Sequence, residues 1–265
     1  MAEVLLDVDE AGVALITLNR PKQHNTWTAE LEREFYGVLA DIDGDPSVRV
    51  AVLTGTGRMF CPGVGGGRLE EIVETGLDYS ERIPFTRTLE FRKPLIAAIN
   101  GGCAGVGFVQ AMMCDIRFMA STAKMTTAFA RRGLPAEHAV SWLLPRIVGV
   151  EHAMDLLLSA RTVTADEAQR LGLVSRVVEA EHLLDDALDY AGQLADNCAP
   201  EAMARIKRQI LIDLHLAVGE AYERAVRQTV AASRRAEFRE GVAAFTERRP
   251  PSFAGLDPSF DSDAE

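Results

Sequence analysis

The sequence lacks the motifs on which several large classes of protein depend. Its four cysteines form no CxxC pair and its histidines are scattered, which argues against a disulfide framework and against a zinc site. It contains no GxxxxGK(S/T) or GxGxxG unit, so nothing indicates a site for a nucleoside triphosphate or a dinucleotide. We therefore expect the protein to hold neither a metal nor a cofactor of its own.

Positive charge is also scarce. The chain has 28 Lys and Arg against 39 Asp and Glu, a net charge of −11, which argues against nucleic acid or an anionic membrane as a partner. The N-terminal MAEVLLDVDE lacks the basic start and long apolar stretch of a signal peptide. Asn100, Gln110 and four glycines interrupt the apolar region 94–114, so it does not predict a membrane helix. We expect a cytoplasmic protein.

The most informative stretch is 93–120, KPLIAAINGGCAGVGFVQAMMCDIRFMA. A short apolar run, Leu95–Ile99, precedes four glycines, and the following segment Phe108–Cys114 is apolar on all sides. This order predicts a strand, a sharp turn and a wholly buried helix. Bare backbone N–H groups at the start of such a helix, aided by the helix dipole, can stabilise a developing negative charge. The stretch indicates an oxyanion site, although a tightly packed turn would also use these glycines.

The rest of the chain predicts alternating strands and helices with a helical end, which suits an α/β core. From Glu181 to about Arg248 nearly every segment has helical character, and the acidic tail 257–265 is expected to be loose. The other expected elements are strands at 4–7, 13–18, 49–54, 117–120 and 125–127, a helix capped by Thr28 and ending near Asp43, a glycine-rich loop at 55–67, a helix at 68–91 broken near Gly76, and a capping box at 164–167.

Several motifs together resemble those of the crotonase superfamily, which includes the enoyl-CoA hydratases and isomerases. The similar segments are Asn19-Arg20-Pro21 with His24-Asn25, Gly57 to Gly63, Lys93 to Ile116, Leu144 to Gly149, Glu167 to Val174, and Glu240 to Phe245. The resemblance implies an α/β fold of the crotonase type, a spiral of ββα turns with a C-terminal helical region.

The resemblance also implies a domain organisation and partners. Residues 1–195 would form the crotonase core, with acyl-CoA binding and the oxyanion hole, and residues 196–265 a helical oligomerisation region with its loose tail. The implied substrate is an acyl-CoA thioester, whose coenzyme A is part of the substrate and not a cofactor. Family members are commonly trimers or dimers of trimers, so we expect a homotrimer or a hexamer.

By the same resemblance, the backbone N–H groups of Val64 and Val106 would hold the thioester oxygen. Gly63, Gly65 and Gly105, together with Val109 and Phe129, would then belong to the substrate pocket. The family usually has an Asp after the residue that matches Val64, and here Gly65-Gly66-Gly67 follows instead. Loss of that Asp removes a source of local hydrogen bonds and could enlarge the pocket.

The expected acid and base are also changed. Hydratases of the family add water with two glutamates, and the matching positions here are Val109 and Phe129, which cannot move a proton. One carboxylate remains, because Glu137 lies four residues after Gly133, where the 3-enoyl-CoA to 2-enoyl-CoA isomerases have their catalytic glutamate. A single glutamate suffices for an isomerase, since it can remove a proton from C2 and return it to C4.

Alternatives to this interpretation remain open. The chain could be an enoyl-CoA hydratase in the broad sense, an enzyme of hydrolase or dehalogenase type with Glu137 as nucleophile, or a binding protein for CoA esters. Weaker site candidates are Trp142 for the substrate pocket, His138 beside Glu137, Arg131 and Arg132 for CoA phosphates, and Glu70 and Glu71 for proton transfer.

Overall fold

The computed structural model describes residues 2–80 and 82–262. Its larger sheet has six strands in the order β1-β2-β3-β5-β7-β10. β1 and β2 form the predicted hairpin, and the remaining neighbours pair in parallel. The central strands are buried along their whole length because helices cover the sheet, as expected for parallel strands. The bounds are β1 Val4–Val8, β2 Val13–Leu18, β3 Val50–Gly55, β5 Leu95–Ile99, β7 Ile116–Ala120 and β10 Arg176–Val178.

A second sheet of four short strands continues from the first. Its order is β4-β6-β8-β9, with bounds Met59–Cys61, Gly102–Ala104, Lys124–Thr126 and Val163–Thr164. β4, β6 and β8 each follow a strand of the larger sheet directly, and α2 and α3 follow β4 and β6. The chain therefore repeats a strand, a strand and a helix, which confirms the predicted α/β spiral of ββα turns.

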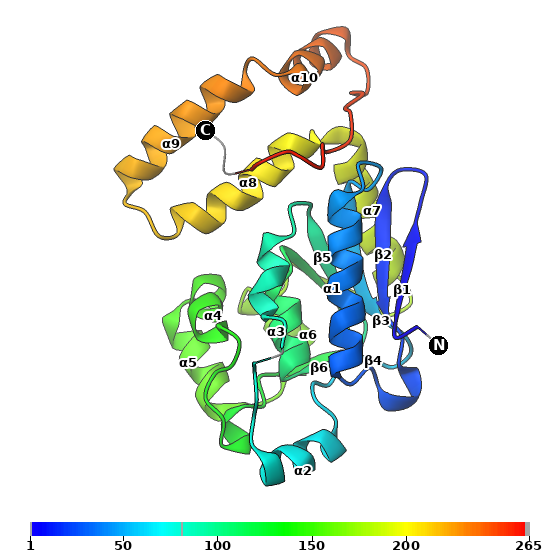
Figure 1. Cartoon of the computed structure of the whole chain (residues 1–265), viewed down its shortest axis with the longest axis vertical. Helices are drawn as coiled ribbons and strands as arrows, with labels where there is room; N and C mark the ends of the chain where they lie inside the picture. The colour runs from blue at the N-terminus through cyan, green and yellow to red at the C-terminus, as the bar shows by residue number, and fades with distance from the viewer. Residues whose placement is uncertain (1, 81, 263–265) are drawn as a thin grey trace.

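The helices α1 to α7 lie around the two sheets (Figure 1). α1 begins after Thr28, whose hydroxyl accepts a hydrogen bond from the Leu31 N–H, so the predicted N-cap is confirmed. All eight residues of α3 are buried, as the sequence indicated. The bounds are α1 Ala29–Gly44, α2 Gly66–Thr75, α3 Val106–Met113, α4 Val140–Val148, α5 Val150–Ser159, α6 Ala165–Arg170 and α7 Leu183–Asn197.

The C-terminal helices are set apart from this body. α7 packs against β2, β3, β5 and β7, whereas α8 Pro200–Asp213, α9 Val218–Ala232 and α10 Ala236–Glu247 form an arm at the top of Figure 1. Hardly any residue of the arm is buried. The predicted helical C-terminal region is confirmed. Among the described residues, no helix is both long and apolar enough to cross a membrane.

Four local expectations need correction. The loop 55–67 contains strand β4, and the region 68–91 holds only α2 and a 3-10 helix at Phe85–Glu90, with Glu81 outside the described residues. Thr164 precedes α6 but its side chain makes no capping hydrogen bond. The tail is anchored as far as it is described, since Phe260 is buried and Arg92 donates hydrogen bonds to the carbonyls of Pro258 and Phe260.

Candidate active site

One cavity of about 920 Å³ brings together segments that are far apart in the chain. Its walls come from residues 26–29 before and at the start of α1, the loop at Val64 with α2, the segment 77–82, Val106 at the start of α3, and residues 132–138. The predicted residues Val64, Gly65, Val106 and Glu137 all lie in this one wall. The described chain thus places both predicted backbone donors and the predicted base around a single hollow.

Two glycine turns face each other at one side of the cavity. Gly63 and Gly105 have φ values of 92° and 53°, which favour glycine. A Cβ atom on Gly63 would lie 3.0 Å from the Ala104 carbonyl oxygen and 3.4 Å from the Val106 nitrogen. A Cβ atom on Gly107 would overlap the Cys61 carbonyl. The two loops therefore approach so closely that only glycine fits between them.

The residue after each glycine presents an unused backbone donor. The Gly63 carbonyl accepts a hydrogen bond of 2.8 Å from the Trp27 N–H, which fixes the first loop. Within the described chain, neither the Val64 N–H nor the Val106 N–H donates a backbone hydrogen bond. Val106 is the first residue of α3, where the helix dipole is positive. Two such donors on facing loops can hold an oxyanion.

Glu137 lies in the cavity wall, in the loop before α4. Its Oε1 accepts a hydrogen bond of 2.7 Å from the Tyr79 hydroxyl. His138 and Ala139, which follow it, both have positive φ values, of 51° and 62°. Such backbone strain in non-glycine residues persists only where the surroundings enforce it, and it is common at functional sites. The half-buried carboxylate is thus held by its loop and by one phenol.

The other predicted site residues lie outside the cavity wall. Gly63 and Gly105 form the turns behind it, while Val109 and Phe129 are buried in the core with 0% and 3% of their surface exposed. Trp142 must be corrected as a pocket residue, because its ring stacks on His215 at 5.3 Å beside a different hollow. Its helix α4 points this side chain toward the end of α8.

The weaker candidates separate in a similar way. Arg132 lines the cavity, whereas the Arg131 guanidinium donates to the Ser159 carbonyl at 3.2 Å. Glu70 and Glu71 are absent from the cavity wall, and Glu71 forms an ion pair with Arg68. The cavity wall carries three arginines in an otherwise acidic protein: Arg68, Arg82 and Arg132. Arg68 and Arg82 are paired with Glu71 and Glu32, and among the described residues Arg132 forms no ion pair, so Arg132 is the wall arginine that suits an anionic ligand.

Sequence reasoning missed an ion pair between Arg82 of the cavity wall and the buried carboxylate of Glu32. Arg82 donates to both carboxylate oxygens of Glu32, at 2.8 and 2.5 Å, and the Glu32 side chain is 3% exposed. The Trp27 indole N–H and the Ile83 N–H complete the coordination at 3.0 Å each. The sequence did contain a signal for this ion pair, because Glu32 lies on the same apolar helix face as Phe35 and Leu39. A carboxylate buried on such a face requires a partner of opposite charge or a hydrogen-bond donor.

The electrostatics of Glu32 follow from these contacts. Burial alone would raise its pKa, but the hydrogen bonds from Arg82, Trp27 and Ile83 outweigh burial and lower the pKa below the usual 4.5. Glu32 therefore stays ionised at neutral pH. His138 behaves differently, because burial lowers its pKa and favours the neutral imidazole beside Glu137.

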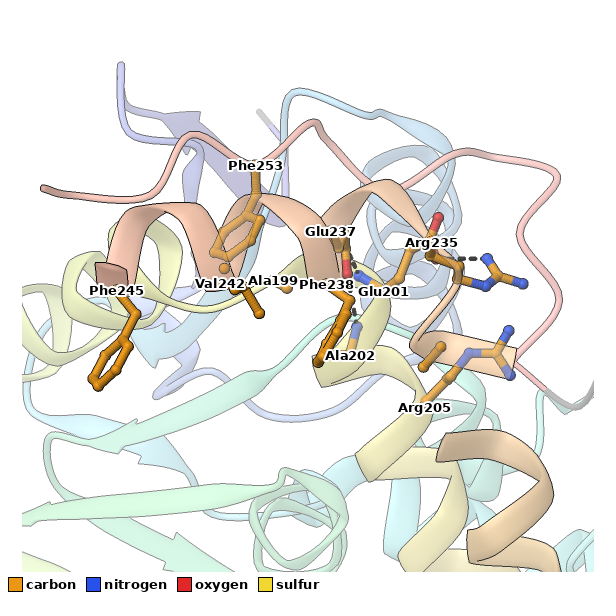
Figure 2. Close-up of a pocket in the computed structure, with 12 residues that line it drawn as sticks. Ala199, Glu201, Ala202, Arg205, Arg235, Glu237, Phe238, Val242, Phe245 and Phe253 are labelled. Atoms are coloured by element: carbon orange, nitrogen blue, oxygen red, sulfur yellow. Dashed lines mark hydrogen bonds and ion pairs between the residues drawn. The ribbon is translucent and has the colours of Figure 1, made fainter. Parts of the chain in front are cut away.

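A second cavity, of about 380 Å³, lies on the C-terminal arm (Figure 2). Phe238, Val242 and Phe253 line it together with residues of α8, and Arg235 forms an ion pair of 2.6 Å with Glu201 there. The Glu237 carboxylate accepts from the N–H groups of Glu201 and Ala202, at 2.9 and 3.3 Å. This hollow offers apolar surface and little chemistry, so the first cavity is the candidate active site.

Comparison with known proteins gives a consistent result. The family model described as enoyl-CoA hydratase/isomerase matches residues 9–256. The chain is 33% identical to the 1,2-epoxyphenylacetyl-CoA isomerase of Escherichia coli (strain K12), over 96% of this chain and 100% of the relative. It is 36% identical to a probable enoyl-CoA hydratase of Rhizobium meliloti (strain 1021), over 95% of this chain and 98% of the relative.

Solved structures show the same similarity in three dimensions. A probable enoyl-CoA hydratase/isomerase from Mycobacterium abscessus superposes with a TM-score of 0.89 at 31% identity, covering 97% of this chain and 100% of that chain. A putative enoyl-CoA hydratase from Streptomyces coelicolor A3(2) gives 0.86 at 32% identity, covering 96% and 94%.

The buried ion pair leads to a prediction about stability. Glu32→Gln leaves the Arg82 charge without its partner, so urea unfolding at pH 7 should show a loss of about 3 kcal/mol. Because the folded pKa of Glu32 is depressed, its contribution is present above about pH 4.5 and is lost as the pH falls through the lower folded value. The difference between variant and wild type should therefore shrink in acid.

Glu90→Gln is the matched control, because the exposed pair Arg87–Glu90 has both side chains 63% exposed. This change should cost less than about 0.5 kcal/mol. Equal stability of Glu32→Gln and wild type at pH 7 would show that the ion pair contributes nothing to the fold.

Proposed function

The chain belongs to the enoyl-CoA hydratase/isomerase family, and within it we propose that the protein isomerises a 3-enoyl-CoA to a 2-enoyl-CoA with Glu137 as the base. The observation that carries the proposal is the common cavity wall of Glu137 with Val64 and Val106. Asp78 is the other carboxylate in that wall, but it accepts a hydrogen bond of 2.8 Å from the Ser80 N–H at the surface. Glu137 is thus the better placed base.

In the proposed reaction the thioester oxygen accepts hydrogen bonds from the Val64 and Val106 N–H groups. The Glu137 carboxylate removes a proton from C2, and the electron pair of the C–H bond moves into the enolate, whose oxygen the two donors stabilise. The same carboxyl group then returns the proton to C4 as the double bond moves to C2. One such backbone donor is typically worth ~10²–10³ in rate.

The residues at the two expected carboxylate positions argue against ordinary hydration at this site. A hydratase needs one group to orient the water and another to supply a proton, and the residues at the two expected positions, Val109 and Phe129, are buried hydrocarbons. The names of several relatives favour the competing assignment, an enoyl-CoA hydratase in the broad sense. The two assignments differ in whether water is added across the double bond.

We further propose the substrate class and the cellular location of the protein. Its substrate carries coenzyme A, so the enzyme requires no separate cofactor, and Arg132 in the cavity wall would meet the anionic part of that substrate. We place the protein in the cytoplasm, with no nucleic acid or membrane as a partner. The acidic net charge of −11 supports the last point.

The arm also supports a proposal about assembly, a homotrimer or hexamer. Ile206 and Ile210 on α8 and Leu214 directly after its end follow one another at helical spacing and are 55%, 58% and 42% exposed. Phe245 on α10 is 86% exposed beside the apolar hollow of Figure 2. Exposed apolar surface of this extent on a protruding arm is typical of a protein–protein interface.

A first prediction concerns hydration. With hydrocarbons at positions 109 and 129, the hydration of crotonyl-CoA should be slower than in a two-glutamate enzyme by ~10²–10⁴ for each missing group. The loss of absorbance of the conjugated thioester measures it. Rapid hydration that survives Glu137→Gln would overturn this assignment of the site.

A second prediction concerns Glu137. Glu137→Gln keeps the shape of the side chain but removes its basicity, so turnover of a 3-enoyl-CoA and exchange of its C2 protons with solvent deuterium should both fall by ~10²–10⁴. Binding of the CoA ester should persist, because the backbone donors are unchanged. Glu70→Gln is the control, since Glu70 lies outside the cavity wall. Wild-type exchange in the Glu137 variant would exclude it as the base.

A third prediction concerns assembly. Light scattering at micromolar protein concentration should give the mass of three or six chains of 28.9 kDa. Ile210→Glu places a charge on the exposed apolar face of α8, so it should shift the protein toward smaller species. A wild-type protein that runs as a monomer would refute the proposal.

A further inference from the structure

The segment 77–80, which follows α2, meets Glu137 in the cavity wall. Residues 77–80 form no helix or strand, yet Leu77, Asp78 and Tyr79 all line the cavity. Tyr79 is 46% exposed, and its hydroxyl donates to Glu137 Oε1 at 2.7 Å. A phenol and a carboxylate that are 58 residues apart in the sequence therefore meet in one cavity wall.

We propose that Tyr79 is a positioning residue for Glu137: its hydroxyl holds Oε1, so that Oε2 remains free to exchange a proton with the substrate, and the Arg82–Glu32 ion pair fixes the segment that carries Tyr79. This inference rests on the proposed role of Glu137. It adds a residue to that site that the family motifs do not mark.

The hydrogen bond has a defined direction, because a carboxylate only accepts and the phenol must donate. Burial, followed by the hydrogen bond to Glu137, raises the pKa of Tyr79 to about 12. The phenol thus stays protonated throughout the neutral range and remains a donor. A donor at one oxygen restricts the rotation of the carboxyl group, and the other oxygen is left for chemistry.

The surroundings fix both partners of this hydrogen bond. The Tyr79 ring meets the His138 ring edge to face at 5.6 Å, and the His138 ring lies 4.3 Å from that of Phe85. On the Glu137 side, the positive φ values of His138 and Ala139 define the loop backbone. Among the described side chains, the Tyr79 hydroxyl donates to the Glu137 carboxylate. Loss of this hydroxyl would let the Glu137 side chain rotate while its backbone stays fixed.

The ion pair between Arg82 and Glu32 holds the chain near Tyr79 against α1. Arg82 follows Tyr79 by three residues, and its guanidinium is bound through two hydrogen bonds to Glu32 on α1. The next residue, Ile83, donates its own N–H to the same carboxylate at 3.0 Å. Three hydrogen bonds thus tie the end of the connecting segment to a helix of the core. The planar fork of arginine makes this contact in a way that lysine cannot reproduce.

The experiment measures C2 proton exchange with solvent deuterium in a 3-enoyl-CoA, as a function of substrate concentration, in wild type and in Tyr79→Phe. Removal of the hydroxyl leaves the Glu137 carboxylate without the donor that orients it. The maximal rate should fall about 10-fold to 100-fold through loss of orientation, with KM changed less than about twofold. Phenylalanine keeps the ring, so a role in packing alone would leave the maximal rate unchanged.

Tyr222→Phe is the matched control, because it removes the same hydroxyl from a residue that is 70% exposed on α9. This variant should keep the wild-type maximal rate and KM. Arg82→Lys keeps the charge but loses the fork, and it should lower the maximal rate as Tyr79→Phe does, by a smaller amount, with KM likewise changed less than about twofold. If Arg82 acts through Tyr79, the double variant should be no slower than Tyr79→Phe alone.

The outcomes separate this inference from the proposed function. If Glu137→Gln abolishes exchange while Tyr79→Phe keeps the wild-type maximal rate, Glu137 is the base and the positioning role of Tyr79 is refuted. If Glu137→Gln exchanges protons normally, the proposed function itself fails. A lowered maximal rate in Tyr79→Phe at nearly unchanged KM, with unchanged thermal stability, supports the inference.

Discussion

The close approach of two glycine turns is the constraint on which the site depends. β4 and β6 pair in parallel, so the turns that follow them, at Gly63 and Gly105, emerge side by side. Gly107 lies so close to the Cys61 carbonyl that no larger residue fits. This strand pairing therefore directs the unpaired N–H groups of Val64 and Val106 toward one cavity. Because both donors belong to the backbone, they remain in place when side chains change.

The side chains proposed for catalysis lie in loops around this fixed backbone. Glu137 stands in a loop, and its carboxylate accepts a hydrogen bond from Tyr79, which lies in a segment without helix or strand. The buried pair Glu32–Arg82 connects those segments to α1. A family that varies its reaction while keeping its fold can change such loop residues at little cost to the core.

The sequence by itself determined the backbone part of this protein. Strand β5, the buried helix α3, the Thr28 cap and the C-terminal helices were predicted, because each depends on local signals such as hydrophobic periodicity, glycine and a capping hydroxyl. The motifs that resemble the crotonase superfamily indicated the fold, and they pointed to Val64, Val106 and Glu137, which line one cavity.

Only the tertiary structure decided the contacts that join distant segments. Tyr79 meets Glu137 across 58 residues and Arg82 meets Glu32 across 50, so no local pattern could pair them. Trp142 carried an apolar signal that fits several surfaces, and the orientation of α4 placed it against His215 instead of the cavity. The tail around Phe260 looked loose in composition, yet Arg92 binds its carbonyls. Side-chain partners depend on how elements pack, and that information is spread over the whole chain.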